Sequence, residues 1–417
     1  MSATHAQTPA RERAILLTLA VVQFTHVMDF MIMMPLGSHL MRVFSITPAQ
    51  FSYLVAAYGL TAAVSGFGAG FFIDRIERKR ALLTLYTGFG LATLACGLAP
   101  TYGTLLVARA AAGAFGGVAS SVLMAMVGDV IPAARRGRGM AVVGAAFPLA
   151  SVLGVPLGLY LAGRYEWHAP FFFLAAMSVG VLLLGLRVLP VLRHLHPPAH
   201  PWDQMRNIVT EPVHLRAFLM SGMLVFAGAC VIPFLAPSMV ANVGLTEEQL
   251  PYIYLAGGFC TFCTTPVFGR LSDKHDKLHV LGWISLGAAA SVLVITNLPA
   301  ATVTVAMVAT AAFMMTMAGR FSPAMAMLTN AVASRYRGGF MSVNSAVQQA
   351  ASGLANLTAG LLVTETASGH LAGFPRVGAL SVACFGLTFF FGWRLRAIAP
   401  HSSRPGHHVE PQPIAAE

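Results

Sequence analysis

The chain has 417 residues, of which 56% are hydrophobic and only 10% are Asp, Glu, Lys or Arg. About a quarter of the residues of a soluble protein are charged, so this composition excludes an ordinary soluble domain and indicates a membrane protein. The formal net charge of +11 at pH 7 would also suit a nucleic-acid-binding protein, so the placement of the basic residues decides what the charge means.

Apolar runs long enough to cross a bilayer recur along the whole chain. A bilayer core about 30 Å thick needs about 20 apolar residues in one helix, and short polar breaks separate the runs. The sequence therefore predicts an all-α membrane protein with twelve transmembrane helices. Their predicted bounds are 14–41, 49–73, 81–99, 104–127, 139–163, 169–192, 216–241, 250–272, 278–298, 301–333, 339–363 and 374–395.

The lysines and arginines gather on one side of these predicted helices. With the N-terminus in the cytoplasm, the inner loops and tails carry nearly all of them, and the outer loops carry Arg42, Arg164 and Arg376. This is the positive-inside pattern, so the charge reports topology and we expect no nucleic-acid partner. We expect a multi-pass protein of the inner (plasma) membrane with both termini in the cytoplasm. The first apolar run is too long for a cleaved signal peptide.

The first predicted helix carries an acidic residue deep in its apolar run. Of the 15 Asp and Glu residues, Asp29 alone lies well inside a predicted span. A charge there costs at least about 2.5 kcal/mol on insertion scales, so it indicates a function. Asp29 can carry protons, or it can serve only as a structural partner of Arg109. The same helical face carries His26, Phe30 and Met33, with Gln23 beside it.

Two stretches of the chain repeat each other without a gap. The second predicted helix matches the eighth at an offset of 199 residues, and the fifth matches the eleventh at an offset of 201. Both copies of the first match begin with Thr-x-x-Gln, a capping box that satisfies N–H groups at a helix end. A duplicated six-helix unit is therefore predicted. The matched pairs are Thr47 and Thr246, Gln50 and Gln249, Tyr53 and Tyr252, Ala57 and Ala256, Gly59 and Gly258, Gly70 and Gly269, Asp74 and Asp273, Arg78 and Lys277, Gly137 and Gly338, Met140 and Met341, and Val142 and Val343.

The duplication sets the expected domain organisation. Residues 1–13 are a cytoplasmic tail, and residues 14–192 are the first six-helix bundle. The polar, proline-rich stretch 193–215 is a cytoplasmic linker. Residues 216–396 are the second bundle, and 397–417 are a disordered cytoplasmic tail. Two bundles related by an internal repeat are typical of transporters, in which the substrate lies near the midplane between halves that rock.

The loop after the second predicted helix is crowded with charge. The run Gly70-Phe-Phe-Ile-Asp74-Arg75-Ile-Glu77-Arg78-Lys79 resembles G-x-x-x-D-R-x-G-R-K, the signature loop of the major facilitator superfamily, with Glu77 in place of the usual Gly. Further motifs resemble the drug and sugar efflux branch of that superfamily, which consists of proton antiporters. These motifs are Arg109-x-x-x-Gly113, with Ala112 in place of a frequent Gln; Gly154-Val-Pro156-Leu-Gly158, with one extra residue before the proline; and Gly128-Asp129 through Pro132 to Arg136-Gly137.

The resemblance implies roles for the motif residues. In this family the signature loop latches the inner side of the outward-facing state, a role that passes to Gly70, Asp74 and Arg78. The repeat adds Gly269, Asp273 and Lys277 as their counterparts. The neighbouring bases Arg75, Lys79 and Arg80 are better interpreted as solvated charges that set the topology. Gly154, Pro156 and Gly158 form the antiporter motif.

The tenth and eleventh predicted helices carry the remaining polar side chains. A stripe on the eleventh covers about 120° of its surface, and it can line a substrate cavity or form interhelical hydrogen bonds. Arg320 on the tenth can contact an anionic substrate, or its side chain can extend to the inner membrane surface. The predicted substrate-cavity residues are Gln23, Phe30, Met33, Arg320, Ser345, Gln348, Gln349, Ser352 and Asn356.

No cofactor or metal site is expected. All five cysteines lie in apolar spans, and Cys260 and Cys263 form a CxxC without a second ligand pair, which favours packing over metal binding. No G-x-x-x-x-G-K-[ST] loop occurs, so ATP is not expected to drive the protein. We expect neither catalytic residues nor an enzymatic activity.

The resemblance and the buried carboxylate together predict a secondary active transporter. It would export a small organic solute, drug-like or sugar-like, in exchange for protons by alternating access, and so contribute to multidrug resistance. Asp29, Arg109 and His26 are the predicted proton-coupling residues. We expect a monomer whose partners are the solute, protons and membrane lipids. A proton-coupled symporter or uniporter of a metabolite, and a non-transporting receptor or scaffold, stay as alternatives.

Overall fold

The computed structural model describes residues 9–69, 76–131, 135–191, 201–333 and 336–404. The signature-loop residues Gly70, Asp74 and Arg75 lie outside these ranges, as does Pro132. The described residues are almost entirely helical, as the composition predicts.

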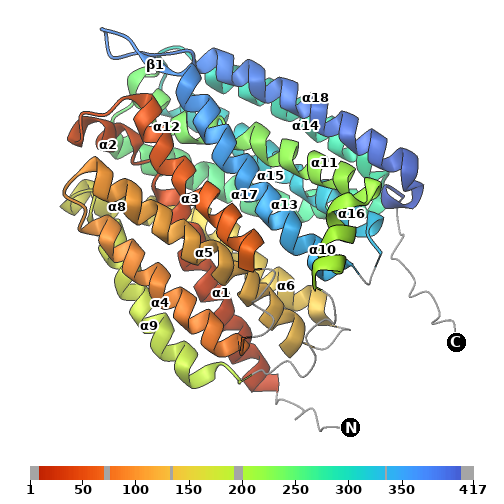
Figure 1. Cartoon of the computed structure of the whole chain (residues 1–417). Coiled ribbons are helices and arrows are strands. Elements are labelled where there is room, and N and C mark those ends of the chain that lie inside the picture. The colour runs from red at the N-terminus through yellow and green to blue at the C-terminus, as the bar shows by residue number, and fades with distance from the viewer. Residues whose placement is uncertain (1–8, 70–75, 132–134, 192–200, 334–335, 405–417) are drawn as a thin grey trace, which may run out of the picture.

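The first half of the chain forms one bundle of helices (Figure 1). Its long apolar segments lie side by side, and their buried faces share a core that α1, α4 and α5 fill with aliphatic and aromatic side chains. The helices are α1 (Pro9–Ile32), α2 (Gly37–Val43), α3 (Pro48–Ala69), α4 (Arg78–Gly97), α5 (Tyr102–Val130), α6 (Arg136–Gly144), α7 (Ala146–Leu149), the π-helical segment η3 (Ala150–Gly154), α8 (Val155–Tyr165) and α9 (Ala169–Val188).

The second half forms a matching bundle, with a short helix in the predicted linker and an antiparallel hairpin before the last helix. Its elements are α10 (Pro201–Thr210), α11 (Pro212–Ala229), α12 (Ile232–Ala241), the 3-10 turn η4 (Glu247–Gln249), α13 (Leu250–Lys274), α14 (Lys277–Thr296), α15 (Val303–Gly319), α16 (Phe321–Ala331), α17 (Arg337–Leu362), β1 (Thr364–Glu365), β2 (Leu371–Ala372), α18 (Phe374–Ile398) and η5 (Pro400–Ser402).

The helices coincide with the twelve predicted spans, but four of the spans are interrupted. A proline accompanies each interruption: Pro35 between α1 and α2, Pro156 after η3, Pro233 in α12 and Pro323 in α16. Proline has no N–H to donate to the preceding turn, so it kinks or breaks a helix. The predicted antiporter motif, Gly154 to Gly158, therefore lies where a π-helical turn meets α8.

Nine helical segments of the described residues are long and apolar enough to cross a membrane. The other three predicted spans are α4, α13 and α17, which are more polar. The first of these begins with three basic residues, and α17 carries the polar stripe. A helix that lines a protein interior can keep such residues because it does not face lipid.

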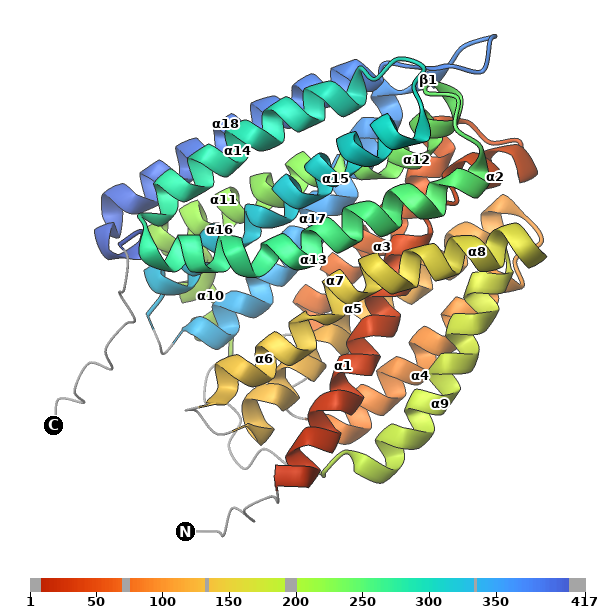
Figure 2. The same cartoon turned by 180° about the vertical axis from the view of Figure 1, so that it is seen from behind.

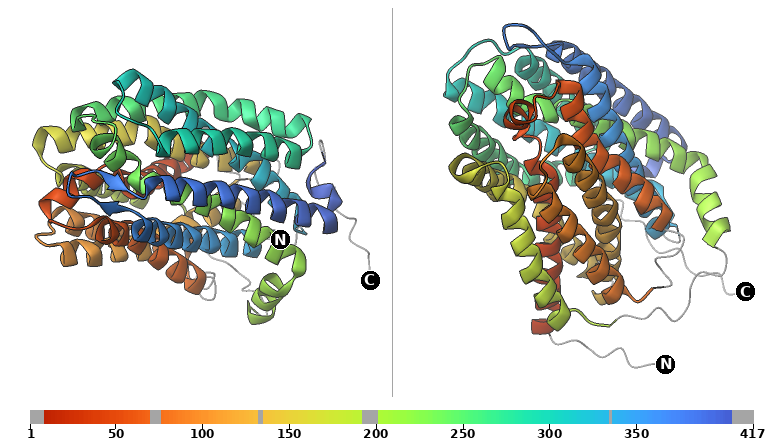
Figure 3. Two further views of the ribbon diagram at one scale, coloured as in Figure 1. Left: turned by 90° about the horizontal axis from the view of Figure 1, so that it is seen from above. Right: turned by 60° about the vertical axis from the view of Figure 1, so that its left-hand side comes forward.

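The two bundles lie closest at the end that carries α2, α12 and β1, which we call the hairpin end (Figure 2). They spread apart toward the opposite end, the tail end, where α1 begins and α18 finishes (Figure 3). Helix α3 packs on α17, and α13 packs on η3 and α8. Glycines permit both contacts: a Cβ added to Gly258 would lie 2.9 Å from the backbone of Ser151, and one added to Gly353 would lie 2.6 Å from Leu60.

The repeat extends to the helix caps. Gln50 Oε1 accepts a hydrogen bond of 2.9 Å from the Thr47 N–H, and Gln249 Oε1 accepts one of 3.1 Å from the Thr246 N–H, so both predicted capping boxes are confirmed. Two further acids cap the next helices: Glu77 caps α4, and Asp276 caps α14. The family signature has a Gly at this position, and this chain has Glu77 there, whose side chain caps α4.

The C-terminal tail is ordered further than expected. Disorder was expected from residue 397, yet α18 continues to Ile398, and Ser402 and Ser403 are fully buried. Ser403 donates a hydrogen bond of 3.1 Å to Asp276, and the Lys277 ammonium donates one of 2.7 Å to the carbonyl of Arg404. The polar composition of this segment did not reveal that two charged residues at the start of α14 hold it, Asp276 through a side chain and Lys277 through a backbone carbonyl.

Candidate functional site

Asp29 and Arg109 meet in the interior of the first bundle. Arg109 Nη1 donates a hydrogen bond of 2.7 Å to Asp29 Oδ2, and neither side chain is exposed. The hydroxyl of Thr93 donates to Asp29 Oδ1 at 3.1 Å. The predicted proximity is therefore confirmed, and the site joins α1, α4 and α5. A role of this pair in proton coupling stays a prediction.

Aromatic rings surround the arginine. Its guanidinium carbon lies 4.8 Å from the ring centre of Tyr58 on α3, and Phe30 packs against the same ring at 5.4 Å. Arg109 Nε and Nη2 have no hydrogen-bond partner among the described residues. The carboxylate is therefore the strongest partner of this cation, and breaking such a buried pair costs about 3–5 kcal/mol.

His26 occupies a separate aromatic pocket one turn away on α1. Its Nδ1 lies 3.2 Å from the hydroxyl of Ser120, and the ring packs between Phe89 at 4.2 Å and Tyr86 at 5.5 Å. Nε2 is buried without a partner among the described residues. No contact links His26 to the Asp29 carboxylate in the described chain, so the structure brings only two of the three predicted coupling residues into direct contact.

The remaining predicted residues of the first span lie on α1 or directly after it, in packed surroundings. Met33 is fully buried in the core shared by both bundles, and Phe30 is half-buried against Tyr58. Gln23 is half-buried, and its Oε1 has no partner among the described residues. This face therefore lies mainly inside the protein, and among the described residues Gln23 Oε1 and His26 Nε2 are its buried polar atoms without a hydrogen-bond partner.

The predicted antiporter motif packs directly against the helix that carries Asp29. A Cβ added to Gly154 would lie 3.1 Å from Met28 Cγ, and one added to Gly158 would lie 2.3 Å from Ile32 Cδ1. Both glycines thus allow η3 and α8 to lie close to α1, on the turns beside Asp29. Pro156 lies where η3 runs into α8. It has no N–H to donate to the preceding turn, which fits the change from a π-helical to an α-helical turn here. The turns of α1 on either side of Asp29 therefore pack against η3 and α8.

The polar stripe of α17 divides into residues with different surroundings. Gln348 donates a hydrogen bond of 2.8 Å to the Ser221 hydroxyl, which favours the structural interpretation for this residue. Ser345 is exposed and Gln349 half-buried, whereas Ser352 is buried. Asn356 is fully buried, and neither atom of its amide has a partner among the described residues.

Arg320 lies inside the second bundle. Only 1% of it is exposed, so its side chain does not extend to the membrane surface. Nη2 lies 2.8 Å from the sulfur of Met317, and the guanidinium carbon lies 4.2 Å from the ring centre of Phe385. Nε and Nη1 have no partner, and no carboxylate of the described residues pairs with it. Within the part of the chain that the structure describes, Arg320 is thus a buried guanidinium without a carboxylate partner.

The predicted latch residues have separate partners at the tail end of each bundle. Arg78 is buried, and its Nε lies 3.4 Å from Asp129 Oδ2 on α5. Lys277 is buried against the tail, whereas Asp273 is exposed. Gly269 is half-buried, and a Cβ added to it would lie 3.9 Å from the hydroxyl of Ser322.

Asp276, an acidic residue that the sequence analysis missed, lies at the tail end of the second bundle beside the predicted latch residue Lys277. Asp276 caps α14, lies 3.4 Å from Arg396 and accepts from Ser403. Its position at the start of α14, matching Glu77 in the repeat, was the available signal.

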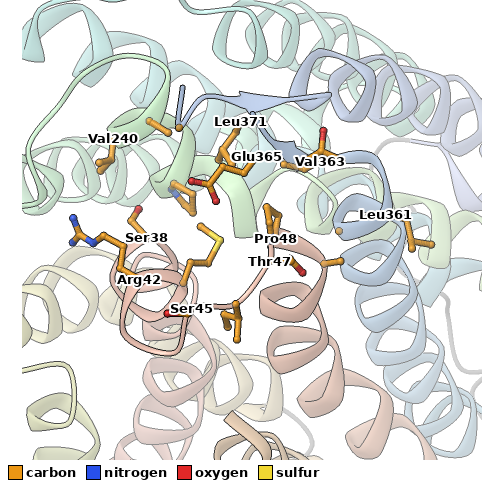
Figure 4. A pocket seen from close by; sticks show the side chains of 18 residues that line it. Ser38, Arg42, Ser45, Thr47, Pro48, Val240, Leu361, Val363, Glu365 and Leu371 are labelled. Carbon is orange, nitrogen blue, oxygen red and sulfur yellow. The ribbon is translucent and has the colours of Figure 1, made fainter. Parts of the chain in front are cut away.

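A second missed contact joins the bundles at the hairpin end. Arg42 on α2 pairs with Glu247 in η4, just before α13, and His39 Nδ1 lies 3.5 Å from the same carboxylate. Beside them a groove of about 830 Å³ separates α2 and α3 from α12, α17 and β1. Figure 4 shows Arg42 and Glu365 lining it from opposite bundles. The sequence analysis treated Arg42 only as a topology signal.

Comparisons with known proteins agree with this architecture. The family model of the Major Facilitator Superfamily matches the chain twice, over residues 19–229 and 217–416. An uncharacterized MFS-type transporter, YceJ of Bacillus subtilis (strain 168), is 27% identical over 367 residues, which are 85% of this chain and 91% of that protein. The vacuolar membrane amino acid uptake transporter fnx2 of Schizosaccharomyces pombe (strain 972 / ATCC 24843) is 31% identical over 152 residues, covering 36% of this chain and 25% of that protein.

Solved structures share the fold at low sequence identity. A bacterial homologue of the human lysosomal transporter Spinster, in an inward-facing and occupied conformation, has a TM-score of 0.77 at 16% identity, covering 96% of this chain and 100% of that one. The human organic anion transporter MFSD10 (TETRAN) has a TM-score of 0.68 at 16% identity, covering 93% of this chain and 100% of that one. The chain therefore belongs to the Major Facilitator Superfamily and is a multi-pass membrane transporter, not an enzyme.

Proposed function

We propose that this transporter exports a small organic solute, drug-like or sugar-like, in exchange for protons, and that Asp29 carries the proton. The observation that supports this most directly is the buried contact between Asp29 and Arg109. A carboxylate in that position can change its charge inside the membrane, which a proton-coupled transporter requires.

The coupling would act through the fit of α1 against η3 and α8. Arg109 favours the ionised carboxylate, whereas burial away from water favours the protonated one. A movement of η3 and α8 along α1 would change the separation of the two side chains or admit water. Either change would alter proton affinity between the two states of the transporter.

The arrangement of the bundles fits one of those states. They contact each other at the hairpin end and spread toward the tail end, which the positive-inside pattern assigns to the cytoplasm. We assign this arrangement to the inward-facing state. Arg42 and Glu247 would then hold the outer end closed, and Arg78 with Asp129 would belong to the inner latch.

The experiment is transport in proteoliposomes under an imposed pH difference of either sign. In export by exchange, the solute moves in the direction opposite to the protons. Uphill accumulation should be lost in Asp29→Asn. It should be retained in the control Glu248→Gln, because Glu248 is an exposed acid at the hairpin end. Accumulation by Asp29→Asn would place the proton site elsewhere. Movement of solute in the same direction as the protons would favour a symporter instead.

A further inference from the structure

The groove at the hairpin end is formed by parts of both bundles. Its volume of about 830 Å³ lies within the range of sites for drug-sized ligands. The first bundle supplies α2, the start of α3 and the loop between them, and the second supplies α12, the end of α17 and the hairpin. Because loops and helix ends make up much of the lining, we place the groove at the water-facing end of the protein.

One side chain in the groove carries a charge that no neighbour compensates. Glu365 on β1 reaches into the groove (Figure 4). No Lys, Arg or His side chain of the described residues pairs with it. Arg42 on the opposite wall already pairs with Glu247. With that pair counted as neutral, one carboxylate is left in the described lining, and it attracts a cation and repels an anion.

The hairpin fixes the position of Glu365. Glu365 on β1 lies opposite Leu371 on β2. The side-chain amide of Asn242, at the end of α12, accepts a hydrogen bond of 2.8 Å from the Leu371 N–H and donates one of 3.0 Å to the Leu371 carbonyl. The hairpin is thus tied to the second bundle beside the groove. A charge that is held in place before a ligand arrives loses less conformational entropy on binding.

The rest of the lining suits an apolar body that carries one polar group. Most of the lining side chains are apolar, among them Met41, Pro237 and Val240. Ser38 also lines the groove, and its buried hydroxyl has no hydrogen-bond partner among the described residues. Buried hydroxyls are nearly always hydrogen-bonded, so this one is free to bond to a ligand. The lining therefore fits an amphipathic organic cation.

Two aromatic rings close the protein directly inside the groove. Phe51 lies one turn further in than Pro48, and Phe234 lies one turn further in than Pro237. Both rings are fully buried, and they pack edge to face with their centres 6.2 Å apart. Because the rings come from opposite bundles, their contact belongs to the arrangement in which this end is closed. The two walls of the groove also come from opposite bundles, so the site is complete only in that arrangement.

We propose that the groove binds a small organic cation from the water at the hairpin end, with Glu365 as the counter-ion, and that the bound cation holds the two bundles together there. A ligand that binds only one of two states shifts the population toward that state. Such a cation would inhibit the transporter. It would act at a site that contains neither Asp29 nor any of the predicted substrate-cavity residues.

The first test is thermal unfolding of the purified full chain in detergent at constant ionic strength. The probes are benzylammonium and benzyltrimethylammonium, and benzyl alcohol is their neutral match. Both cations should raise the unfolding midpoint as their concentration increases, because a ligand that binds only the folded protein stabilises it. Glu365→Gln should weaken cation binding about fivefold, the scale of one ion pair at a partly exposed site. The control Glu166→Gln should not, because Glu166 is an exposed acid outside the lining.

The second test follows the opening of the hairpin end in proteoliposomes. Ser52 on α3 is fully buried and lies beside Gly360 of α17, between the bundles. Ser52→Cys, in a background without the five native cysteines, should react with a membrane-impermeant thiol reagent when that end opens. Benzyltrimethylammonium, added on the same side as the reagent, should slow this labelling. Glu365→Gln should remove most of the protection.

Both halves of the proposal can fail. No midpoint shift with either cation, equal shifts in the wild type and Glu365→Gln, or an equal effect of benzyl alcohol would overturn the site. Midpoint shifts that depend on Glu365, together with an unchanged labelling rate, would overturn the closing role. Glu365 is exposed, so Glu365→Gln is expected to fold. Neither measurement uses a transported solute or a proton gradient, so both are independent of whether Asp29 carries the proton.

Discussion

Arg109 and Asp29 form a fully buried ion pair, 2.7 Å between Nη1 and Oδ2, that links the fourth transmembrane segment to the first inside one bundle. Each charge in such a pair depends on the other for solvation. Any state in which the pair opens must supply water, a proton or a new partner. This dependence makes the pair suitable for coupling proton binding to a change of state.

The first prediction separates stability from coupling at this pair. Asp29→Asn and Arg109→Gln should each destabilise the protein by about 3–5 kcal/mol, because each leaves one buried charge unpaired. The double variant should recover much of that loss, since no unpaired charge remains. Unfolding midpoints measured for the four proteins provide the cycle.

Transport by the same four proteins supplies the contrast. Uphill, pH-driven accumulation should stay absent in the double variant even though its stability returns. If the double variant transports normally, the pair is structural only, which is the alternative that the sequence left open.

The second prediction concerns the two glycines that face α1. A larger residue at Gly158 must displace Ile32, whose Cδ1 would lie 2.3 Å from the new Cβ. We expect Gly158→Ala to reduce transport severalfold, and Ile32→Ala to restore part of the rate in the double variant. Gly163→Ala is the matched control on the same helix, because nothing lies within 4 Å of its added Cβ. A Gly158→Ala rate equal to that of the control would contradict the proposed link between α8 and Asp29.

The third prediction tests topology. Tags at residue 5, in the linker 193–215 and at residue 410 should all face the cytoplasm, and a tag between Val243 and Glu248 should face outward. The reason is the concentration of lysine and arginine in the loops of the tail end. Protease or thiol-reagent access in intact cells gives the readout. Access to the linker from outside would show that the span count or the orientation is wrong.

The sequence predicted the helices well, and specific contacts less well. Length and hydropathy determine where a membrane helix can form. The repeat predicted that Thr47 and Thr246 begin equivalent helices, and both form capping boxes in the structure. The proximity of Asp29 and Arg109 was also predictable, because few charges occur within the spans. The separation of His26 from Asp29 was not, since residues on one helical face can point toward different neighbours. The same holds for Asp276, because one of its partners, Ser403, comes from a tail that was predicted to be disordered.

The fourth prediction addresses the signature loop and its described part. Asp129→Asn removes the carboxylate that Arg78 approaches at 3.4 Å, at the tail end of the first bundle. We expect slower transport with less than about a tenfold change in the solute Kd, which corresponds to 1.4 kcal/mol. The same pattern is expected for Asp74→Asn. A large loss of affinity with normal turnover would show that these residues contact the solute instead of stabilising one state.

The last prediction concerns the ion pair between Arg42 and Glu247, which connects the two bundles at the hairpin end. If this end must open during each cycle, a covalent bridge between the two positions will stop transport. The two substitutions Arg42→Cys and Glu247→Cys are made in a background without the five native cysteines. A short bifunctional thiol reagent with a reducible link then joins the two new cysteines. Initial rates are measured before crosslinking, after it and after reduction. We expect that crosslinking stops transport and that reduction restores it.

The matched control is Glu12→Cys with Arg135→Cys, because that pair, at 3.0 Å, lies within the first bundle. Its crosslink should leave transport largely intact. Full turnover with Arg42→Cys and Glu247→Cys completely crosslinked would show that the hairpin end stays closed throughout the cycle, and alternating access by separation of the bundles at this end would be wrong.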